Sequence, residues 1–230
     1  MIIEVDGAEI HRKVFDRGEL EALRQEADRV ADRSESVCVR HLQQRSELFD
    51  QLAKEPRVRA LIPRGLQPVR SILFDKTPAS NWPVPWHQDL TIAVDQKRDA
   101  EGYGPWSIKD GVVHVQPPAT LLEAMATVRI HLDDATTSSG ALWVIPGSHR
   151  LGRISSVQVA DLAEGDAIPC ECRAGDVLVM SPLVLHSSRR TKDAQQRRVL
   201  HFEYARLEDL DPQLDWHRPR ADRGPEPASA

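Results

Sequence analysis

Three pairs of side chains in this sequence place a histidine two positions before an acidic residue. The pairs are His87 with Asp89, His131 with Asp133, and His201 with Glu203. In an extended strand, residues i and i+2 point to the same side, so each pair can offer two ligands to one metal ion. Two histidines and one carboxylate form the facial ligand set of non-haem Fe(II), which leaves coordination positions open for reactants. One such pair and a histidine from elsewhere in the chain would complete this ligand set, which is suited to metal-dependent oxidation.

The surroundings of His87 and Asp89 distinguish this pair from the other two. It ends the segment 81–89, which reads Asn-Trp-Pro-Val-Pro-Trp-His-Gln-Asp. The prolines restrict the backbone, and the tryptophans can exclude water from a pocket. His87 and Asp89 are therefore the predicted metal ligands.

The other two pairs have structural interpretations. His131 and Asp133 are expected at the end of a strand, where they would serve the turn at 134–140. His201 is expected to support the metal ligands from behind, or to lie in the core as a hydrogen-bonded histidine.

The third metal ligand must come from a part of the chain that the fold brings alongside His87. His186 is the candidate, because it ends the apolar run 183–185 and is followed by two serines. A short apolar run of this kind is typical of a buried strand. The predicted ligand set is thus His87, Asp89 and His186.

Two arginines that follow His186 in the sequence could bind a co-substrate next to the metal. Arg197 and Arg198 begin the last predicted strand, and either could grip a carboxylate through two parallel hydrogen bonds. A dicarboxylate co-substrate would then span from the metal to the arginine. Strand alternation places Arg197 on the side of His201 and Arg198 on the more apolar side, so Arg197 is favoured and Arg198 is the alternative.

The first third of the chain reads as helical and should position the later strands from outside. Asp16 is a predicted helix N-cap, and apolar residues then recur at three- and four-residue steps as one buried stripe. A second helical stretch covers 46–60. We expect helices within about 16–62 to cover a sheet.

The rest of the chain contains short apolar or alternating runs bounded by Gly, Pro and Asp. They lie at 69–74, 112–115, 126–132, 141–145, 176–180, 183–186 and 197–204. Such strands without helices between them predict an antiparallel sandwich or jelly roll, with a core at about 69–205. A parallel dinucleotide-binding sheet would require helices between the strands, so that class is excluded.

Composition limits the remaining possibilities. The 230 residues are 40% hydrophobic and 28% charged, and 30 basic against 35 acidic residues give a net charge of −5. One globular domain at 1–210 is expected. Bulk charge does not favour a nucleic-acid partner, no apolar run is long enough for a membrane helix, and the start of the chain lacks the pattern of a signal peptide. We therefore expect a cytoplasmic protein, and nothing in the sequence specifies an oligomeric state.

Two segments are expected to be irregular. The polar stretch 95–111 has no clear period but carries Tyr103 and Trp106, which favours a lid over the site. Residues 211–230 are expected to form a loose C-terminal tail.

Several of these motifs, taken in order, resemble the phytanoyl-CoA dioxygenase family over about 69–205. They include Phe-Asp-Lys-Thr-Pro (74–78), the 81–89 segment, Arg-Ile-His-Leu-Asp-Asp (129–134), Gly-Ala-Leu-Trp-Val-Ile-Pro-Gly-Ser-His (140–149), Gly-Asp-Val-Leu (175–178) and Arg-Arg-Val-Leu-His (197–201). The resemblance implies a mainly β protein with flanking helices, a double-stranded β-helix of the cupin-like jelly-roll type. It also implies Fe(II), 2-oxoglutarate and O2 as the reacting partners.

The resemblance also implies roles for individual residues. These are iron ligation by His87, Asp89 and His186, binding of the distal carboxylate of 2-oxoglutarate by Arg197, and contact with that co-substrate by Ser188. Arg129 stands where some members have a tryptophan, and Lys76 belongs to a recurring motif near the pocket; both are candidate co-substrate contacts.

The expected function is hydroxylation of a C–H bond in a small molecule, with release of succinate and CO2. Asp89 disfavours halogenation, because related halogenases carry Gly or Ala at the corresponding position. The alternative is a small-molecule binding barrel that holds its metal without turnover, and the presence of Arg197 argues against it.

Overall fold

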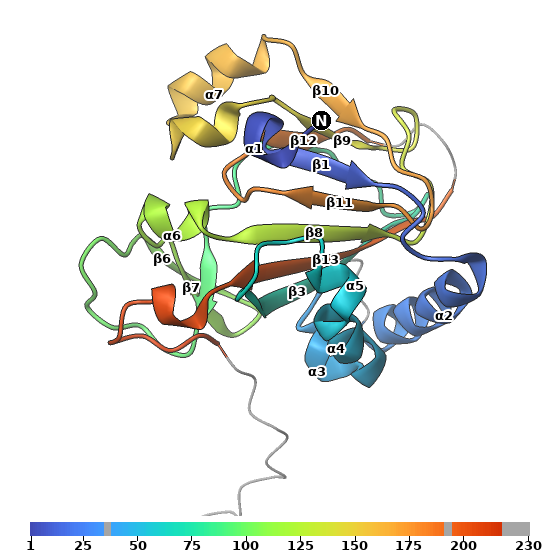
Figure 1. The fold of residues 1–230 in the computed structure, drawn as a ribbon, viewed down its shortest axis with the longest axis horizontal. Coiled ribbons are helices and arrows are strands. Elements are labelled where there is room, and N and C mark those ends of the chain that lie inside the picture. The colour runs from blue at the N-terminus through green and yellow to red at the C-terminus, as the bar shows by residue number, and fades with distance from the viewer. Residues whose placement is uncertain (35–37, 191–194, 218–230) are drawn as a thin grey trace, which may run out of the picture.

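The computed structural model describes residues 1–34, 38–190 and 195–217. Its largest element is a six-stranded antiparallel sheet, here called the major sheet (Figure 1). In spatial order, the strands are β1 (Ala8–His11), β11 (Val177–Met180), β8 (Ala126–His131), β13 (Arg197–Ala205), β3 (Gln67–Lys76) and β2 (Cys38–Arg40). The two edge strands of this sheet, β1 and β2, precede residue 69. The strands of the core therefore begin earlier in the chain than the predicted range of about 69–205.

A second antiparallel sheet of four strands, the minor sheet, completes the jelly roll. Its order is β10 (Ile168–Cys170), β9 (Leu142–Val144), β12 (His186–Ser188) and β4 (Val84–His87). The predicted fold class is confirmed, although the two sheets do not join into a closed barrel. Strand β12 begins where the sequence predicted a strand to end, because residues 183–185 form the approach to it.

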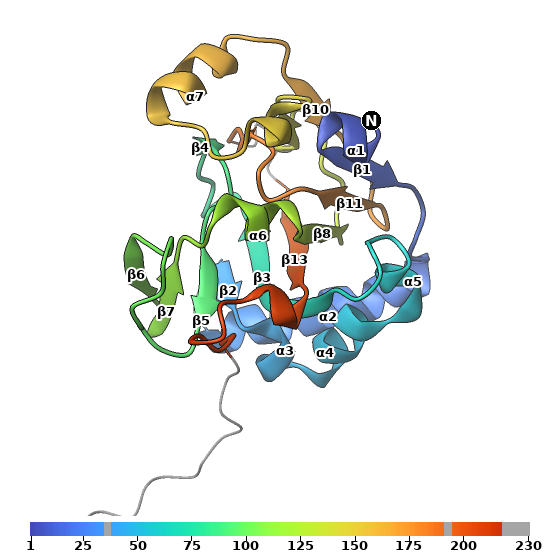
Figure 2. The same ribbon diagram turned by 60° about the vertical axis from the view of Figure 1, so that its left-hand side comes forward.

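Helices cover the outer face of the major sheet, as predicted (Figures 1 and 2). They are α2 (Arg17–Ser34), α3 (Leu42–Arg45), α4 (Glu47–Lys54) and α5 (Pro56–Arg59). Asp16 caps α2, since its Oδ1 accepts a hydrogen bond from the Glu19 backbone N–H at 2.9 Å and Glu19 reciprocates at 2.8 Å. The apolar stripe of α2 packs into one core cluster with the major sheet.

Strand β13 divides its side chains between this core and the interior between the sheets. Leu200, Phe202 and Tyr204 are fully buried in the cluster beneath the helices. Arg197 and His201 point the other way and line a pocket. This is the period of two that the sequence predicted for this strand.

The segment 95–111 differs from the expected irregular lid. It contains β6 (Trp106–Lys109), which pairs with β7 (Val112–Val115), and β7 pairs in turn with β5 (Ile92–Val94). Tyr103 and Trp106 pack against a hydrophobic cluster of this third sheet rather than over the pocket described below. The two aromatic side chains therefore have a packing role here.

The expectation of a loose tail from residue 211 is wrong for its first part. Leu214 and Trp216 are only 5% and 6% exposed, and Trp216 forms a β-bridge with Val94. The Trp216 indole N–H also donates to the Leu207 carbonyl at 3.2 Å. Apolar burial at these two positions outweighs the polar composition around them. The remainder of the predicted tail, 218–230, lies outside the described residues.

The remaining elements complete the ends of the sandwich. They are α1 (Ile3–Asp6), α6 (Ala119–Glu123), η1 (Ser148–Leu151), α7 (Ser156–Ala163) and η2 (Leu207–Asp209). In the part of the chain that the structure describes, no helix combines the length and apolar character needed to cross a bilayer.

Candidate metal centre

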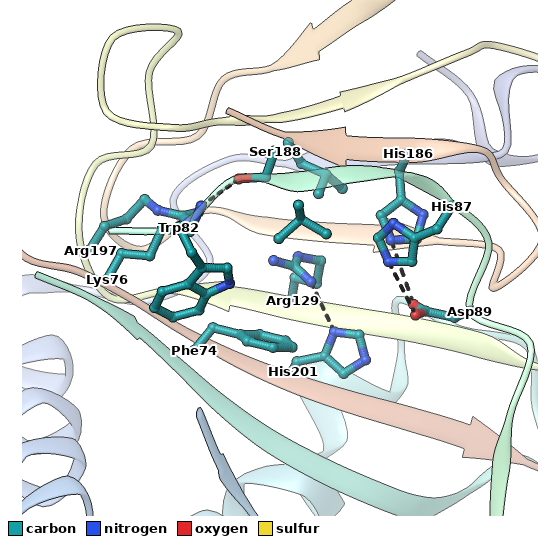
Figure 3. A pocket seen from close by; sticks show the side chains of 12 residues that line it. Phe74, Lys76, Trp82, His87, Asp89, Arg129, His186, Ser188, Arg197 and His201 are labelled. Atoms are coloured by element: carbon teal, nitrogen blue, oxygen red, sulfur yellow. Dashed lines mark hydrogen bonds and ion pairs between the residues drawn. The ribbon is translucent and has the colours of Figure 1, made fainter. Parts of the chain in front are cut away.

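The three predicted metal ligands meet between the two sheets. His87 ends β4, His186 begins β12, and the two residues are direct register partners in the minor sheet. Asp89 follows two residues after His87. Its carboxylate lies 3.9 Å from His87 Nε2 and 3.8 Å from His186 Nε2 (Figure 3). The three ligand atoms all lie within 4.8 Å of one another, which is the spacing of a shared ion.

Both imidazole rings are oriented for metal binding by a backbone carbonyl. His87 Nδ1 lies 2.8 Å from the Pro85 carbonyl and His186 Nδ1 lies 2.9 Å from the Val184 carbonyl. A carbonyl can only accept, so each Nδ1 carries the proton and each Nε2 presents its lone pair to the site. Fixing the tautomer in this way is a regular feature of metal-binding histidines.

Burial keeps the His186 ring in the form that a metal ion needs. His186 is 3% exposed, and desolvation lowers its pKa to about 4, partly opposed by the charge of Asp89. At neutral pH the ring is therefore uncharged and can act as a ligand.

Asp89 carries an oxygen whose partner is missing among the described residues. Its Oδ2 is buried and accepts no hydrogen bond from them. A buried carboxylate oxygen without a partner is costly, and a cation in the centre of the three ligands would satisfy it. The donor set and this orphaned oxygen fit a divalent iron ion.

Gln88, which lies between His87 and Asp89, anchors this segment to the rest of the fold. The Gln88 amide donates to the Leu183 carbonyl at 2.6 Å and the Gly152 carbonyl at 2.8 Å. Its oxygen accepts from the Ile154 backbone N–H at 2.9 Å. Because Gln88 is buried, these three bonds fix the backbone from which the flanking ligands project.

The opposite end of the pocket is cationic. Lys76 Nζ donates to Ser188 Oγ at 2.9 Å and lies 5.4 Å from the Trp82 ring centre. Burial lowers the pKa of Lys76 to about 7, helped by the nearby charges of Arg197 and Arg129. Burial and Arg129 likewise lower the pKa of Arg197 to about 10. Such an end is suited to a carboxylate, which would offset the clustered positive charge.

The two candidate arginines of β13 lie in different environments. Arg198 points to the helix side, where its Nε donates to Asp133 at 2.8 Å and its Nη1 donates to Asp28 at 2.7 Å. Arg197 lines the pocket, is 3% exposed, and forms no ion pair with any described carboxylate. Of the two, Arg197 is the guanidinium that faces the pocket.

Arg129 projects from β8 between the metal ligands and the cationic end (Figure 3). Its Nη1 lies 3.0 Å from His201 Nδ1, and its guanidinium carbon lies 5.4 Å from the Phe74 ring centre. His201 in turn contacts Glu203 at 3.2 Å. The structure therefore brings all seven predicted site residues, and His201, to one pocket.

Four apolar side chains complete the walls of this pocket. The cavity measures about 110 Å³, and its apolar lining comes from Phe74, Trp82, Val84 and Leu142. Except for Trp82, these residues had no predicted role at the site. Two of these residues could have been found from the strand pattern. Phe74 lies two residues before Lys76 on β3, and Leu142 is the register partner of Ser188.

His131 and Asp133 do not form a second metal site. Asp133 lies beyond the end of β8 and turns to the helix side, where it accepts from Arg198 and Arg24. His131 is buried, and burial lowers its pKa well below the usual value. The i, i+2 rule fails for this pair because the strand ends at His131.

The facing sheets and the His-Asp-His group between them define a jelly-roll protein with a facial metal-ligand set. The chain belongs to the phytanoyl-CoA dioxygenase family, whose sequence model matches residues 3–199. The resemblance read from the motifs is thus confirmed.

Curated relatives match only part of the chain. Uncharacterized proteins of Mycobacterium tuberculosis and Mycobacterium bovis are each 29% identical over 109 residues. The match covers 45% of this chain and 39% of each relative, so these relatives extend well beyond the matched region.

Solved structures share the fold over most of the chain. HygX from Streptomyces hygroscopicus, with nickel and 2-oxoglutarate bound, is 20% identical, with 88% of this chain and 84% of HygX covered and a TM-score of 0.64. AviO1 from Streptomyces viridochromogenes is 21% identical, with coverages of 97% and 95% and a TM-score of 0.64. The carbocyclase SnoK from nogalamycin biosynthesis is 18% identical, with coverages of 89% and 81% and a TM-score of 0.68.

Proposed function

We propose that this protein is an Fe(II)- and 2-oxoglutarate-dependent dioxygenase that hydroxylates a C–H bond of a small molecule. The observation that carries the proposal is the pairing of two features in one pocket. A facial His-Asp-His set lies at one end, and a buried cluster of lysine, arginine and serine lies at the other.

The protein's own residues would hold Fe(II) through His87 Nε2, His186 Nε2 and the Asp89 carboxylate. When bound there, the iron supplies the redox chemistry that activates O2. Three protein ligands leave positions for a bidentate keto acid and for O2. The apolar walls would exclude water from the reacting groups.

The cationic end would bind the distal carboxylate of 2-oxoglutarate. Arg197 can meet it with a guanidinium fork, while Lys76 and Ser188, already hydrogen-bonded to each other, can add donors. The keto group and its adjacent carboxylate would then point toward His87 and His186. This fixed orientation reduces the entropic cost of reaching the reactive geometry.

The overall reaction balances with these reactants alone. One molecule each of 2-oxoglutarate, O2 and substrate R–H would give succinate, CO2 and R–OH. One oxygen atom enters succinate and the other enters the alcohol. Oxidative decarboxylation supplies two electrons and the C–H bond supplies two, which together reduce O2.

A small-molecule substrate is supported by the size of the pocket and by its combination of apolar walls with a few charged groups. Solved structures with this fold include HygX with hygromycin B bound and the epimerase SnoN with nogalamycin RO bound. We propose that this chain also acts on a small organic molecule, and that no nucleic acid or membrane takes part.

Anaerobic titration tests co-substrate binding. Adding Fe(II) and 2-oxoglutarate should produce a weak metal-to-ligand absorption band in the visible range, because the keto acid chelates the iron. His186→Ala should abolish the band, while His11→Ala, a change at a partly exposed histidine of β1 outside the site, should preserve it. Absence of the band in the unaltered protein would contradict the proposal.

A second measurement separates catalysis from simple binding. Succinate release in air should be stimulated by at least one member of a metabolite library and should stop when Asp89 is replaced by Asn. A protein that gives the band but consumes no 2-oxoglutarate with any compound would instead be the binding barrel.

A further inference from the structure

Arg129 is held by a neutral histidine rather than by a carboxylate. A guanidinium has only donors, so His201 Nδ1 must accept the hydrogen bond from Arg129 Nη1 at 3.0 Å. The ring proton therefore lies on Nε2, which donates to Glu203 Oε1 at 3.2 Å. His201 adds no negative charge beside Arg129.

The far end of this chain of contacts is closed by a second arginine. Arg70 Nη1 donates to the same Glu203 oxygen at 3.0 Å and to the Thr91 carbonyl at 3.2 Å. Glu203 is thus paired with Arg70, and its exposure is only 3%. In the buried order Arg70, Glu203, His201, Arg129, the first arginine is paired with a carboxylate, whereas Arg129 contacts only a histidine.

Arg129 lines the pocket and donates one hydrogen bond to the described residues, the bond to His201. It is 6% exposed, its Nε has no partner among the described residues, and Asp89 is the carboxylate whose charge most favours its ionised form. Burying a guanidinium with one hydrogen bond and no ion pair is unfavourable unless a ligand supplies the missing acceptors. The site is therefore prepared for an anion.

The position of Arg129 indicates which anion this is. Lys76 and Arg197 lie at one end of the pocket, the metal ligands lie at the other, and Arg129 lies between them (Figure 3). A keto acid anchored on Arg197 would place its second carboxylate, the one next to the keto group, toward Asp89 and Arg129. Two carboxylates would then meet two separate arginines.

We propose that Arg129 binds the keto-adjacent carboxylate of 2-oxoglutarate, and that His201, backed by Glu203 and Arg70, is its positioning residue. The proposal rests on the proposed function and adds a second anchor to it. The neutral acceptor orients Arg129 without neutralising it, so its full charge remains for the ligand. A carboxylate in the place of His201 would form an ion pair with Arg129 and weaken that interaction.

A co-substrate lacking one carboxylate separates the two anchors. 2-Oxovalerate keeps the keto acid end but has no distal carboxylate. Binding of 2-oxoglutarate and 2-oxovalerate should be titrated anaerobically with Fe(II), using the visible band, in the unaltered protein, Arg129→Met and Arg197→Met. Fe(II) affinity without keto acid and thermal unfolding should be measured on each variant to verify folding.

Arg129→Met should weaken both ligands by about ten- to hundredfold, the loss expected for a hydrogen bond to a charged group. Arg197→Met should weaken 2-oxoglutarate to a similar extent but leave 2-oxovalerate unchanged. Unchanged binding of 2-oxovalerate to Arg129→Met would overturn the proposal, because Arg129 would then serve the distal end or the substrate. Failure of the proposed function looks different, since the unaltered protein would give no band with 2-oxoglutarate.

Variants of His201 test the positioning role. His201→Leu removes the acceptor and should weaken 2-oxovalerate by about tenfold. His201→Asn retains an acceptor near the place of Nδ1 and should restore most of that affinity. Glu203→Gln still accepts from His201 and should bind the ligand nearly as well as the unaltered protein. Equal affinity in the leucine and asparagine variants, with differences only in unfolding temperature, would assign His201 a purely structural role.

Discussion

His87 and His186 are register partners on antiparallel strands, and their ring centroids lie 4.2 Å apart. Residues from distant parts of the chain thus become direct neighbours through the pairing of β4 with β12. The distance between the two imidazoles is set by backbone hydrogen bonds of the minor sheet rather than by a loop. A ligand pair on paired strands is more rigid than one on flexible segments.

Replacing Asp89 by Asn should separate metal affinity from folding. Asn keeps the shape of the side chain but removes the charge that a divalent ion requires. We expect Fe(II) affinity to fall by more than about a hundredfold, beyond the usual effect of residues that only orient a ligand. The unfolding temperature of the metal-free protein should stay equal or rise, because the buried Oδ2 of Asp89, which accepts no hydrogen bond from the described residues, is replaced by a neutral amide group. Calorimetric titration and thermal unfolding provide the two readings, and a parallel loss of metal-free stability would contradict the expectation.

The neighbouring arginines of β13 form a matched pair for a second test. Arg197→Met should raise the dissociation constant for 2-oxoglutarate by at least about tenfold and change stability little. Arg198→Met should leave that constant unchanged but reduce the free energy of unfolding by about 1–3 kcal/mol, because Asp133 loses its main partner in a partly buried pair. Chemical denaturation and ligand titration of both variants distinguish them. The reverse pattern would show that Arg198 is the anchor.

Binding of 2-oxoglutarate should depend on pH through Lys76. With a pKa lowered to about 7, Lys76 is charged below this pH and neutral above it in the ligand-free protein. A carboxylate beside it favours the charged form, so binding takes up a proton and weakens as pH rises. We expect affinity to fall by about tenfold from about pH 6 to about pH 8. Lys76→Met should abolish this slope, and a slope retained in the variant would assign it to another group.

Gln88 should contribute to both stability and site geometry. Gln88→Ala removes one acceptor and two donors from buried partners and should reduce the free energy of unfolding by about 2–4 kcal/mol. Fe(II) affinity should fall as well, since Gln88 lies between two ligands. Gln25→Ala, on the exposed face of α2, is the control and should change neither quantity. Loss of stability with unchanged metal affinity would show that the ligands are held by strand pairing alone.

The sequence was sufficient to select three residues that the fold brings together as a candidate metal site, because the signals for them are local. A histidine two residues before an acid, stiffened by prolines, and a histidine at the end of an apolar run are visible without any tertiary information. The alternation of β13 likewise predicted that Arg197 and Arg198 face opposite sides, because a buried strand has a strict period of two.

Features that depend on tertiary contacts escaped prediction. Strand β1 has little alternation of its own and exists because β11 offers it an edge. Trp216 is buried although its neighbours are polar, and β6 forms within a stretch that has no clear pattern. The Arg129–His201 contact joins residues opposite each other on β8 and β13, so it required the strand register.

The two-sided arrangement of β13 has a practical consequence for engineering. On β13, Arg197 and His201 line the pocket, whereas Leu200, Phe202 and Tyr204 lie in the core cluster beneath the helices. A mutant library that randomises only pocket-facing positions of the major sheet should therefore yield a high share of folded variants with altered selectivity. Diversity introduced at Leu200, Phe202 or Tyr204 would instead be lost to aggregation before any new activity could be screened.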